Sequence, residues 1–206
     1  RQMCIRDSAT ARGISDDELH IVVYDSTGAQ TGFDNDVAGE RTSSVLETYD
    51  MIDLLELTKI SNTRQATTLK DTGTKYRKTL RYDVDHRMFP ELCERIENIV
   101  NDGTKVNQFD LLLYNKGYFY KKHTDILKDP RRRIWTSITM IDKQDLTGGE
   151  LVVYLDDDEV VIDLDIGETV VFKSSYMHEA KEVLNGSRLV LVAWLINAWL
   201  YLCKQV

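Results

Sequence analysis

Cysteine and proline are scarce in this chain of 206 residues, and no hydrophobic run is long enough to cross a membrane. The cysteines, Cys4, Cys93 and Cys203, are odd in number, far apart and form no Cys-x-x-Cys pair. This pattern argues against a disulfide framework or a structural zinc site and favours a reducing, cytoplasmic compartment. The most apolar stretch, 189–203, is interrupted by Asn197 and is shorter than the roughly 20 residues that a bilayer requires. We expect a buried strand with a packed tail there, and no membrane association.

An excess of positive charge is also missing. Lys and Arg total 26 against 34 Asp and Glu, for a net charge of −8, which argues against binding a nucleic acid by bulk charge. With 42% hydrophobic and 29% charged residues, the composition is that of an ordinary globular protein. The length suits one domain with an extension. We expect a polar N-terminal extension over 1–88, whose helices and loops brace the core, and a main domain over 89–206.

The extension contains one helical pattern and one polar stretch. Within 43–59, apolar residues that include Leu46, Tyr49 and Ile52 form an imperfect helical stripe. The Thr-rich stretch 61–79 would suit a mobile substrate lid, but flexible composition alone names no role. We prefer the interpretation that this segment braces the core.

From residue 89 the patterns are clearer. Apolar residues over 89–100 have helical spacing, with Pro90 in the first turn, and Asp102-Gly103 would end that helix. Short strand-like runs then alternate with turn residues. The eight runs are Phe109–Tyr114, Tyr118–His123, Ile134–Ile141, Glu150–Leu155, Val160–Leu164, Thr169–Phe172, Met177–Lys181 and Arg188–Ile196. Strands without intervening helices predict a mainly β fold with flanking helices, either an antiparallel barrel or a double-sheet jelly roll.

Three side chains in this region have the chemistry of a metal site. His123 and Asp125 project from the same face of a strand, although a His-x-Asp pair alone is more often a surface pair. His178, on a later strand, completes a set of two histidines and one carboxylate. Such a set leaves adjacent coordination positions open, which suits Fe(II), a chelating cosubstrate and O2. A closed zinc site would need another Cys or His nearby.

Arg188 begins the last predicted strand. Its expected inward-facing neighbours Val190, Val192 and Trp194 include no acidic residue, yet a buried guanidinium needs a carboxylate partner. An external dicarboxylate would provide one.

Residues 89–196 resemble the catalytic domain of the Fe(II)/2-oxoglutarate-dependent dioxygenases, in the prolyl 4-hydroxylase-like branch. The matching segments are YNKGYFYKKHTD at 114–125, GGEL at 148–151, GETVVF at 167–172, HE at 178–179 and GSR at 186–188, which leads to Trp194. The resemblance implies a double-stranded β-helix (jelly-roll) core, iron held by His123, Asp125 and His178, and Arg188 bound to the distal carboxylate of 2-oxoglutarate.

The resemblance also suggests further cosubstrate contacts. Tyr114 would face the cosubstrate, or be an ordinary core tyrosine, and the two alternatives are equally supported. Ile138 and Met140 would line the pocket, and a tyrosine that some relatives carry at the latter position is missing here. Trp194 would wall the pocket, or belong to the core.

The reaction implied by the family is hydroxylation of a C–H bond with Fe(II), 2-oxoglutarate and O2, and with ascorbate as reductant. The expected substrate is a prolyl residue in a peptide or protein. A free amino acid, another small molecule or a nucleic-acid base would be an alternative, and a non-catalytic jelly-roll metal binder is an alternative of another class. A basic collar over Lys116–Arg133 would attract an acidic substrate, although surface charge often has no such role.

Overall fold

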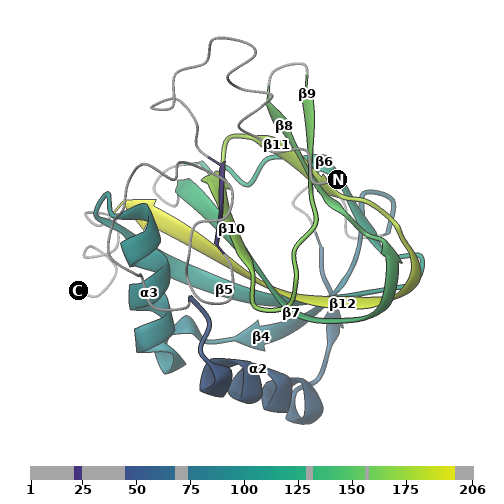
Figure 1. Ribbon diagram of the computed structural model, residues 1–206, viewed down its shortest axis with the longest axis horizontal. Helices are drawn as coiled ribbons and strands as arrows, with labels where there is room; N and C mark the ends of the chain where they lie inside the picture. Colours follow the sequence, from purple (N-terminus) through teal and green to yellow (C-terminus); the bar gives the residue numbers. More distant parts are fainter. Residues whose placement is uncertain (1–20, 25–44, 68–73, 129–131, 156–157, 198–206) are drawn as a thin grey trace.

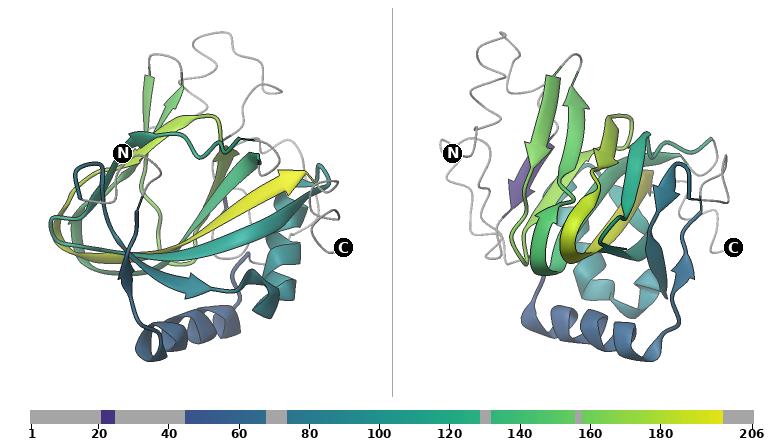
Figure 2. Two further views of the ribbon diagram at one scale, coloured as in Figure 1. Left: turned by 180° about the vertical axis from the view of Figure 1, so that it is seen from behind. Right: turned by 90° about the vertical axis from the view of Figure 1, so that its right-hand side faces the viewer.

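The computed structural model describes residues 21–24, 45–67, 74–128, 132–155 and 158–197. These residues form two antiparallel sheets that face each other, with two α-helices on the outside of the larger sheet (Figures 1 and 2). The double-sheet jelly roll expected from the strand pattern is therefore confirmed.

The larger sheet has seven strands and the smaller has five. In spatial order the larger sheet comprises β1 (Ile21–Tyr24), β10 (Thr169–Lys173), β7 (Arg133–Gly148), β12 (Val183–Asn197), β5 (Thr104–Asn115), β4 (Leu80–Val84) and β2 (Arg64–Gln65). The smaller comprises β3 (Arg77–Lys78), β6 (Phe119–His123), β11 (Met177–Ala180), β8 (Leu151–Leu155) and β9 (Asp158–Ile162). The helices are α2 (Thr48–Ile60) and α3 (Pro90–Val100), and a short 3-10 helix spans His86–Met88.

Strand alternation divides the interior into two apolar layers. On β5 and β12, Leu111 and Leu191 face the helices, whereas Leu112 and Val190 face the smaller sheet. Successive side chains of a strand point to opposite faces, so one central pair of strands builds both layers. The inward set expected on the last strand, from Arg188 to Trp194, points into the layer between the sheets.

Several expected strands are shorter than the observed ones. β7 and β12 have 16 and 15 residues and curve along the whole molecule (Figure 1). Their turn ends include Gly148 and Gly149, which have φ of +71° and +74°, a backbone region that favours glycine. The polar N-terminal zone, expected to brace the core with helices and loops, also supplies β1 to β4 to the two sheets.

The helix over 89–100 is confirmed as α3, whereas the apolar stripe proposed for the preceding helix was wrong. Tyr49 and Ile52 are 48% and 54% exposed, and the buried residues of α2 are Asp50 and Leu54. Asp50 is buried because Arg95 of α3 forms an ion pair with it. Within the described ranges, no helix has the length and apolar character that a membrane span requires. Residues 198–206, the expected packed tail, lie outside those ranges.

Candidate metal and cosubstrate site

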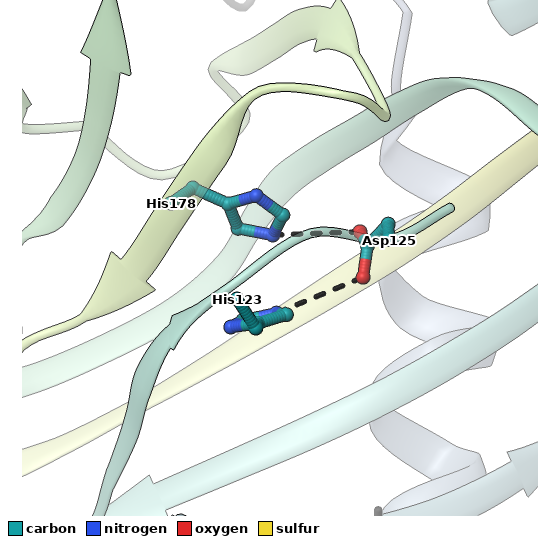
Figure 3. A group of neighbouring side chains, drawn as sticks. All are labelled: His123, Asp125 and His178. Carbon is teal, nitrogen blue, oxygen red and sulfur yellow. Dashed lines mark ion pairs between the residues drawn. The ribbon is translucent and has the colours of Figure 1, made fainter. Parts of the chain in front are cut away.

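The three residues expected to bind a metal lie together on the smaller sheet. His123 ends β6 and pairs in register with His178 of β11, and Asp125 follows two residues later. His123 Nε2 lies 3.6 Å from Asp125 Oδ1, and His178 Nε2 lies 3.5 Å from Asp125 Oδ2 (Figure 3). The three ligand atoms are all within 4.8 Å of one another. Because a metal bonded at about 2.0–2.2 Å holds its ligands roughly 3–4 Å apart, small side-chain movements would bring all three onto one ion.

The hydrogen bonds of both imidazoles fit metal binding. His123 Nδ1 lies 2.7 Å from the carbonyl oxygen of Lys121, and His178 Nδ1 lies 3.0 Å from that of Tyr176. A carbonyl oxygen only accepts hydrogen bonds, so each Nδ1 carries the proton. Each Nε2 therefore has its lone pair available on the side of Asp125, as a metal ligand requires.

The protonation states of His123 and Asp125 are also those that metal binding requires. Burial and the neighbouring His178 together lower the pKa of His123 to about 4. Burial alone would raise the pKa of Asp125, but the two histidines hold it below its ordinary value, so this group is a carboxylate. Burial opposes a charge on His178, but Asp125 raises its pKa, so in the metal-free protein His178 is the imidazole that accepts a proton.

Two side chains of the larger sheet hold Asp125 in place. Thr136 Oγ1 of β7 and Trp194 Nε1 of β12 donate hydrogen bonds to Asp125 Oδ2, at 2.9 and 2.8 Å. Thr136 Oγ1 also lies 2.9 Å from Ser174 Oγ. Sequence analysis missed Thr136 and Ser174, because a hydroxyl on a strand gives no local signal of its partner.

Arg188 lies where the cosubstrate anchor was expected. It is buried, with 6% exposure, and its Nε has no hydrogen-bond partner. Burial lowers its pKa, and Tyr114 and Glu150 raise it only in part. Its guanidinium carbon lies 4.6 Å from the centroid of the Tyr114 ring. Among the described residues no carboxylate forms an ion pair with Arg188, so this buried cation fits a carboxylate supplied by a ligand.

A cavity of about 1700 Å³ between the sheets contains both the triad and Arg188. Ile138, Met140, Tyr114 and Trp194 are among its lining residues, and Tyr114 and Trp194 also belong to the buried apolar layer between the sheets, the alternative left open for both. Pockets for small ligands are typically about 300–1,000 Å³. The cavity therefore has room for a cosubstrate together with part of a larger substrate.

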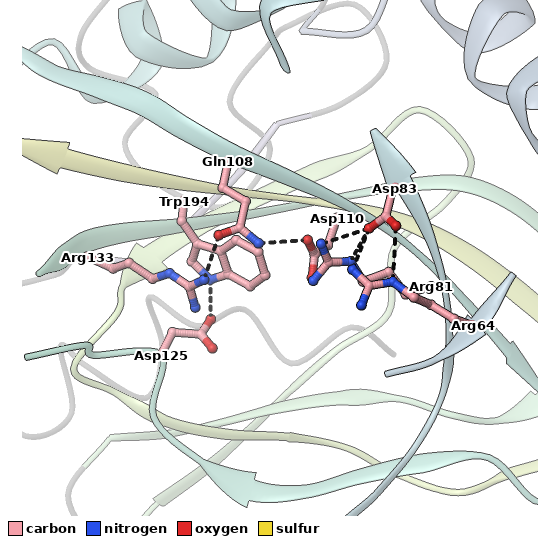
Figure 4. Close-up of polar contacts among 8 residues, drawn as sticks. All are labelled: Arg64, Arg81, Asp83, Gln108, Asp110, Asp125, Arg133 and Trp194. Atoms are coloured by element: carbon pink, nitrogen blue, oxygen red, sulfur yellow. Dashed lines mark hydrogen bonds and ion pairs between the residues drawn. The ribbon is translucent and has the colours of Figure 1, made fainter. Parts of the chain in front are cut away.

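A chain of polar side chains leads from this cavity to the surface, and sequence analysis did not identify it. Its members, in order, are Arg133, Gln108, Asp110, Arg81, Asp83 and Arg64 (Figure 4). They come from β7, β5, β4 and β2, so no local pattern connects them. Arg133, expected in an exposed basic collar, is half-buried and donates to Gln108 Oε1 at 3.1 Å. Lys116, Lys121, Lys122 and Lys128 are exposed, and 129–131 lie outside the described residues.

Comparison with known proteins connects this geometry to a family. Residues 109–196 match the model of the 2OG-Fe(II) oxygenase superfamily. A PKHD-type hydroxylase of Prochlorococcus marinus (strain MIT 9515) is 37% identical over 78 residues, which are 37% of this chain and 35% of that protein. The match thus spans about a third of that relative's length.

Solved structures share the fold. A prolyl-4-hydroxylase from Pseudomonas putida superposes with a TM-score of 0.57 at 20% identity, over 75% of this chain and 90% of that one. A prolyl hydroxylase from Trichoplax adhaerens, in complex with a peptide fragment of the hypoxia inducible factor oxygen degradation domain, gives a TM-score of 0.61 at 15% identity. That superposition covers 89% of this chain and 86% of the other.

Proposed function

We propose that this chain, a member of the 2OG-Fe(II) oxygenase superfamily through residues 109–196, is a dioxygenase that hydroxylates a prolyl residue of a peptide or protein. The observation that carries the proposal is the presence in one cavity of the His123–Asp125–His178 group and of Arg188, which has no carboxylate ion-pair partner among the described residues. A protein that only stored a metal would have no use for a buried arginine without a carboxylate.

Three of these residues would bind the metal, and the fourth would bind the cosubstrate. His123, Asp125 and His178 would hold Fe(II), and Arg188 would bind the distal carboxylate of 2-oxoglutarate. When bound, these groups and O2 supply an oxidation in which a substrate C–H becomes C–OH and 2-oxoglutarate becomes succinate and CO2. Ascorbate would serve as reductant for the iron. The chain itself directs Nε2 of both imidazoles toward Asp125, orients the Asp125 carboxylate, and shields Arg188 from water.

A peptide substrate is favoured by the size of the cavity and by the likeness to prolyl hydroxylases, one of them in complex with a peptide. The same chemistry on a free amino acid, another small molecule or a nucleic-acid base is the alternative.

A turnover assay tests the proposed hydroxylation. The protein is incubated with Fe(II), 2-oxoglutarate, ascorbate and a panel of proline-containing peptides, and succinate and peptide masses are measured. We expect succinate release together with a peptide that gains one oxygen atom. Iron-loaded protein that binds 2-oxoglutarate but modifies no peptide would refute the prolyl assignment and leave the alternative substrates.

Arg188→Met tests the cosubstrate anchor, with Lys143→Met as the matched control. Lys143 also lines the cavity, but Asp165 pairs with it at 2.7 Å. Losing one partner of a buried charge pair costs about 2 kcal/mol or more, so we expect 2-oxoglutarate to bind roughly 30-fold or more weakly to Arg188→Met. Calorimetry measures this affinity without turnover. Unchanged affinity in Arg188→Met would favour a non-catalytic metal-binding jelly roll.

A further inference from the structure

A second buried arginine lies close to the metal ligands, and the proposed chemistry does not use it. Arg77 of the edge strand β3 is only 7% exposed. Its guanidinium carbon lies 4.5 Å from the centroid of the Tyr120 ring, and that ring stacks on His123 with 3.4 Å between centroids. Arg77 Nε has no hydrogen-bond partner. Within the described part of the chain, no carboxylate forms an ion pair with Arg77.

Arg133 repeats this arrangement behind another metal ligand. Its guanidinium carbon lies 3.6 Å from the centroid of the Trp194 ring, and the Trp194 indole donates to Asp125. Among the described residues Arg133 Nε also has no hydrogen-bond partner, and Arg133 Nη2 donates to the neutral amide oxygen of Gln108. Two metal ligands are thus each backed by an aromatic ring that carries a guanidinium.

Among the described residues, no carboxylate forms a direct ion pair with Arg77 or Arg133. Asp110, the buried carboxylate nearby, already pairs with Arg81 at 3.2 Å and accepts a hydrogen bond from Gln108 at 2.8 Å. Burial lowers the pKa of Arg133, the charges of Asp125 and Asp110 offset this only in part, and the nearby charge of Arg77 lowers the pKa as well.

The lining of the cavity also carries an excess of positive charge. Eight cationic and five acidic side chains line the cavity, although the chain as a whole carries −8. Fe(II), the Asp125 carboxylate, the 2-oxoglutarate dianion and Arg188 would together be neutral, so the filled site would still leave Arg77 and Arg133 without an ion-pair partner among the described residues. A buried charge without a partner is costly.

We propose that the substrate carries a carboxylate next to the group that is oxidised, and that Arg77 and Arg133 bind it. The proposal rests on the proposed function and narrows its substrate class. The shared chemistry is a carboxylate that accepts charge-assisted hydrogen bonds from guanidinium groups. It has two possible sources, the terminal carboxylate of a chain that ends in proline, or an acidic side chain adjacent to an internal proline.

The proposal is tested by calorimetry, which measures the affinity for peptide probes in the presence of Fe(II) and 2-oxoglutarate. The measurement is made under argon, because without O2 no turnover occurs. One pair of probes is a tripeptide ending in proline as the free acid or as the amide. The other is an end-blocked peptide with Asp-Pro or Asn-Pro in the same context. We expect the acid of at least one pair to bind about tenfold or more tightly than its neutral partner, and the pair that shows this identifies the source.

The variants Arg77→Met and Arg133→Met should each reduce that ratio to nearly one without changing the affinity for 2-oxoglutarate. Arg77→Lys and Arg133→Lys keep the positive charge and should retain part of the preference for the acid probe. These two variants also keep the proposal testable if a Met variant does not fold. Lys143→Met should keep the full ratio, because that cation already has an acidic partner.

Equal binding of acid and neutral probes, a preference that survives both Met variants, or no binding of any probe would overturn the proposal. The proposed function is judged separately, by succinate release. Turnover of the neutral peptides without an acid preference leaves the function standing and rejects this substrate class. Preferential binding of the acid without turnover supports the carboxylate site and rejects the prolyl hydroxylase assignment.

Discussion

Replacing Trp194 with phenylalanine would remove one hydrogen bond from the buried Asp125 carboxylate and keep an aromatic ring against Arg133. Trp194 Nε1 donates to Asp125 Oδ2 at 2.8 Å, and Thr136 Oγ1 donates to the same oxygen at 2.9 Å. Losing a partner behind a metal ligand typically weakens metal affinity about 10–100-fold, or roughly 1.4–2.7 kcal/mol. We expect the dissociation constant for Mn(II), used as an air-stable substitute for Fe(II), to rise by that factor in Trp194→Phe, measured by calorimetry.

Trp135→Phe is the matched control, since it removes the same kind of hydrogen bond elsewhere on the larger sheet. Trp135 Nε1 donates to Asp102 Oδ2 at 2.7 Å, and neither residue belongs to the triad. Its Mn(II) affinity should equal that of the wild type. Equal losses in both variants would point to a general effect on the fold. An unchanged dissociation constant in Trp194→Phe would refute the idea that the indole orients Asp125.

Two further predictions concern stability. Gly186 has φ of +71°, and a Cβ there would overlap the backbone of the facing strand, whereas Gly103, with φ of +79°, has open space around it. Gly186→Ala should therefore lower the melting temperature clearly more than Gly103→Ala. Equal losses would show that the overlap does not matter and that only the backbone angle does. Burial alone would raise the pKa of Asp102, but hydrogen bonds from Trp135 and Thr104 hold it below its ordinary 3.8. A lowered carboxyl pKa stabilises the fold above the unfolded value and that contribution is lost as pH falls through the folded value. Asp102→Asn should therefore melt below the wild type at pH 7, with a gap that narrows below about pH 4, and a gap independent of pH would contradict this.

The sequence predicts the parts of the site that depend on strand parity. Arg188 and Trp194 share the inward face of β12 because an even number of positions separates them. Asp125, by contrast, lies two residues past the end of β6, and its backbone and side-chain hydrogen bonds place it rather than strand alternation. The sequence does not predict the hydrogen bonds that orient Asp125, because Thr136 and Ser174 are ordinary polar residues until the sheets close. The positions of Arg77 and Arg133 are hidden for the same reason. A lysine- and arginine-rich segment looks exposed unless its aromatic partners are known.

Local periodicity failed for the first helix because a long-range ion pair overrode it. Asp50 of α2 is buried against Arg95 of α3, and Arg95 Nε also donates to the carbonyl oxygen of Val45 at 3.0 Å. Once that carboxylate is paired, the helix can turn its charged face inward and leave Tyr49 and Ile52 exposed. The pair is 45 residues apart, so a pattern read over a few turns could not reveal it.

The two halves of the site belong to different sheets, and Asp125 joins them. Both histidines are on strands of the smaller sheet, whereas Arg188 is on β12 of the larger sheet. Asp125 follows a strand of the smaller sheet, yet its backbone N–H donates to the carbonyl oxygen of Ser174 and its carboxylate accepts from β7 and β12. The distance between the His123–Asp125–His178 group and Arg188 is therefore fixed by the packing between the sheets. It follows that substitutions at residues of the apolar layer between the sheets that do not line the cavity, such as Val153 and Val170, should affect binding at the triad and at Arg188 together.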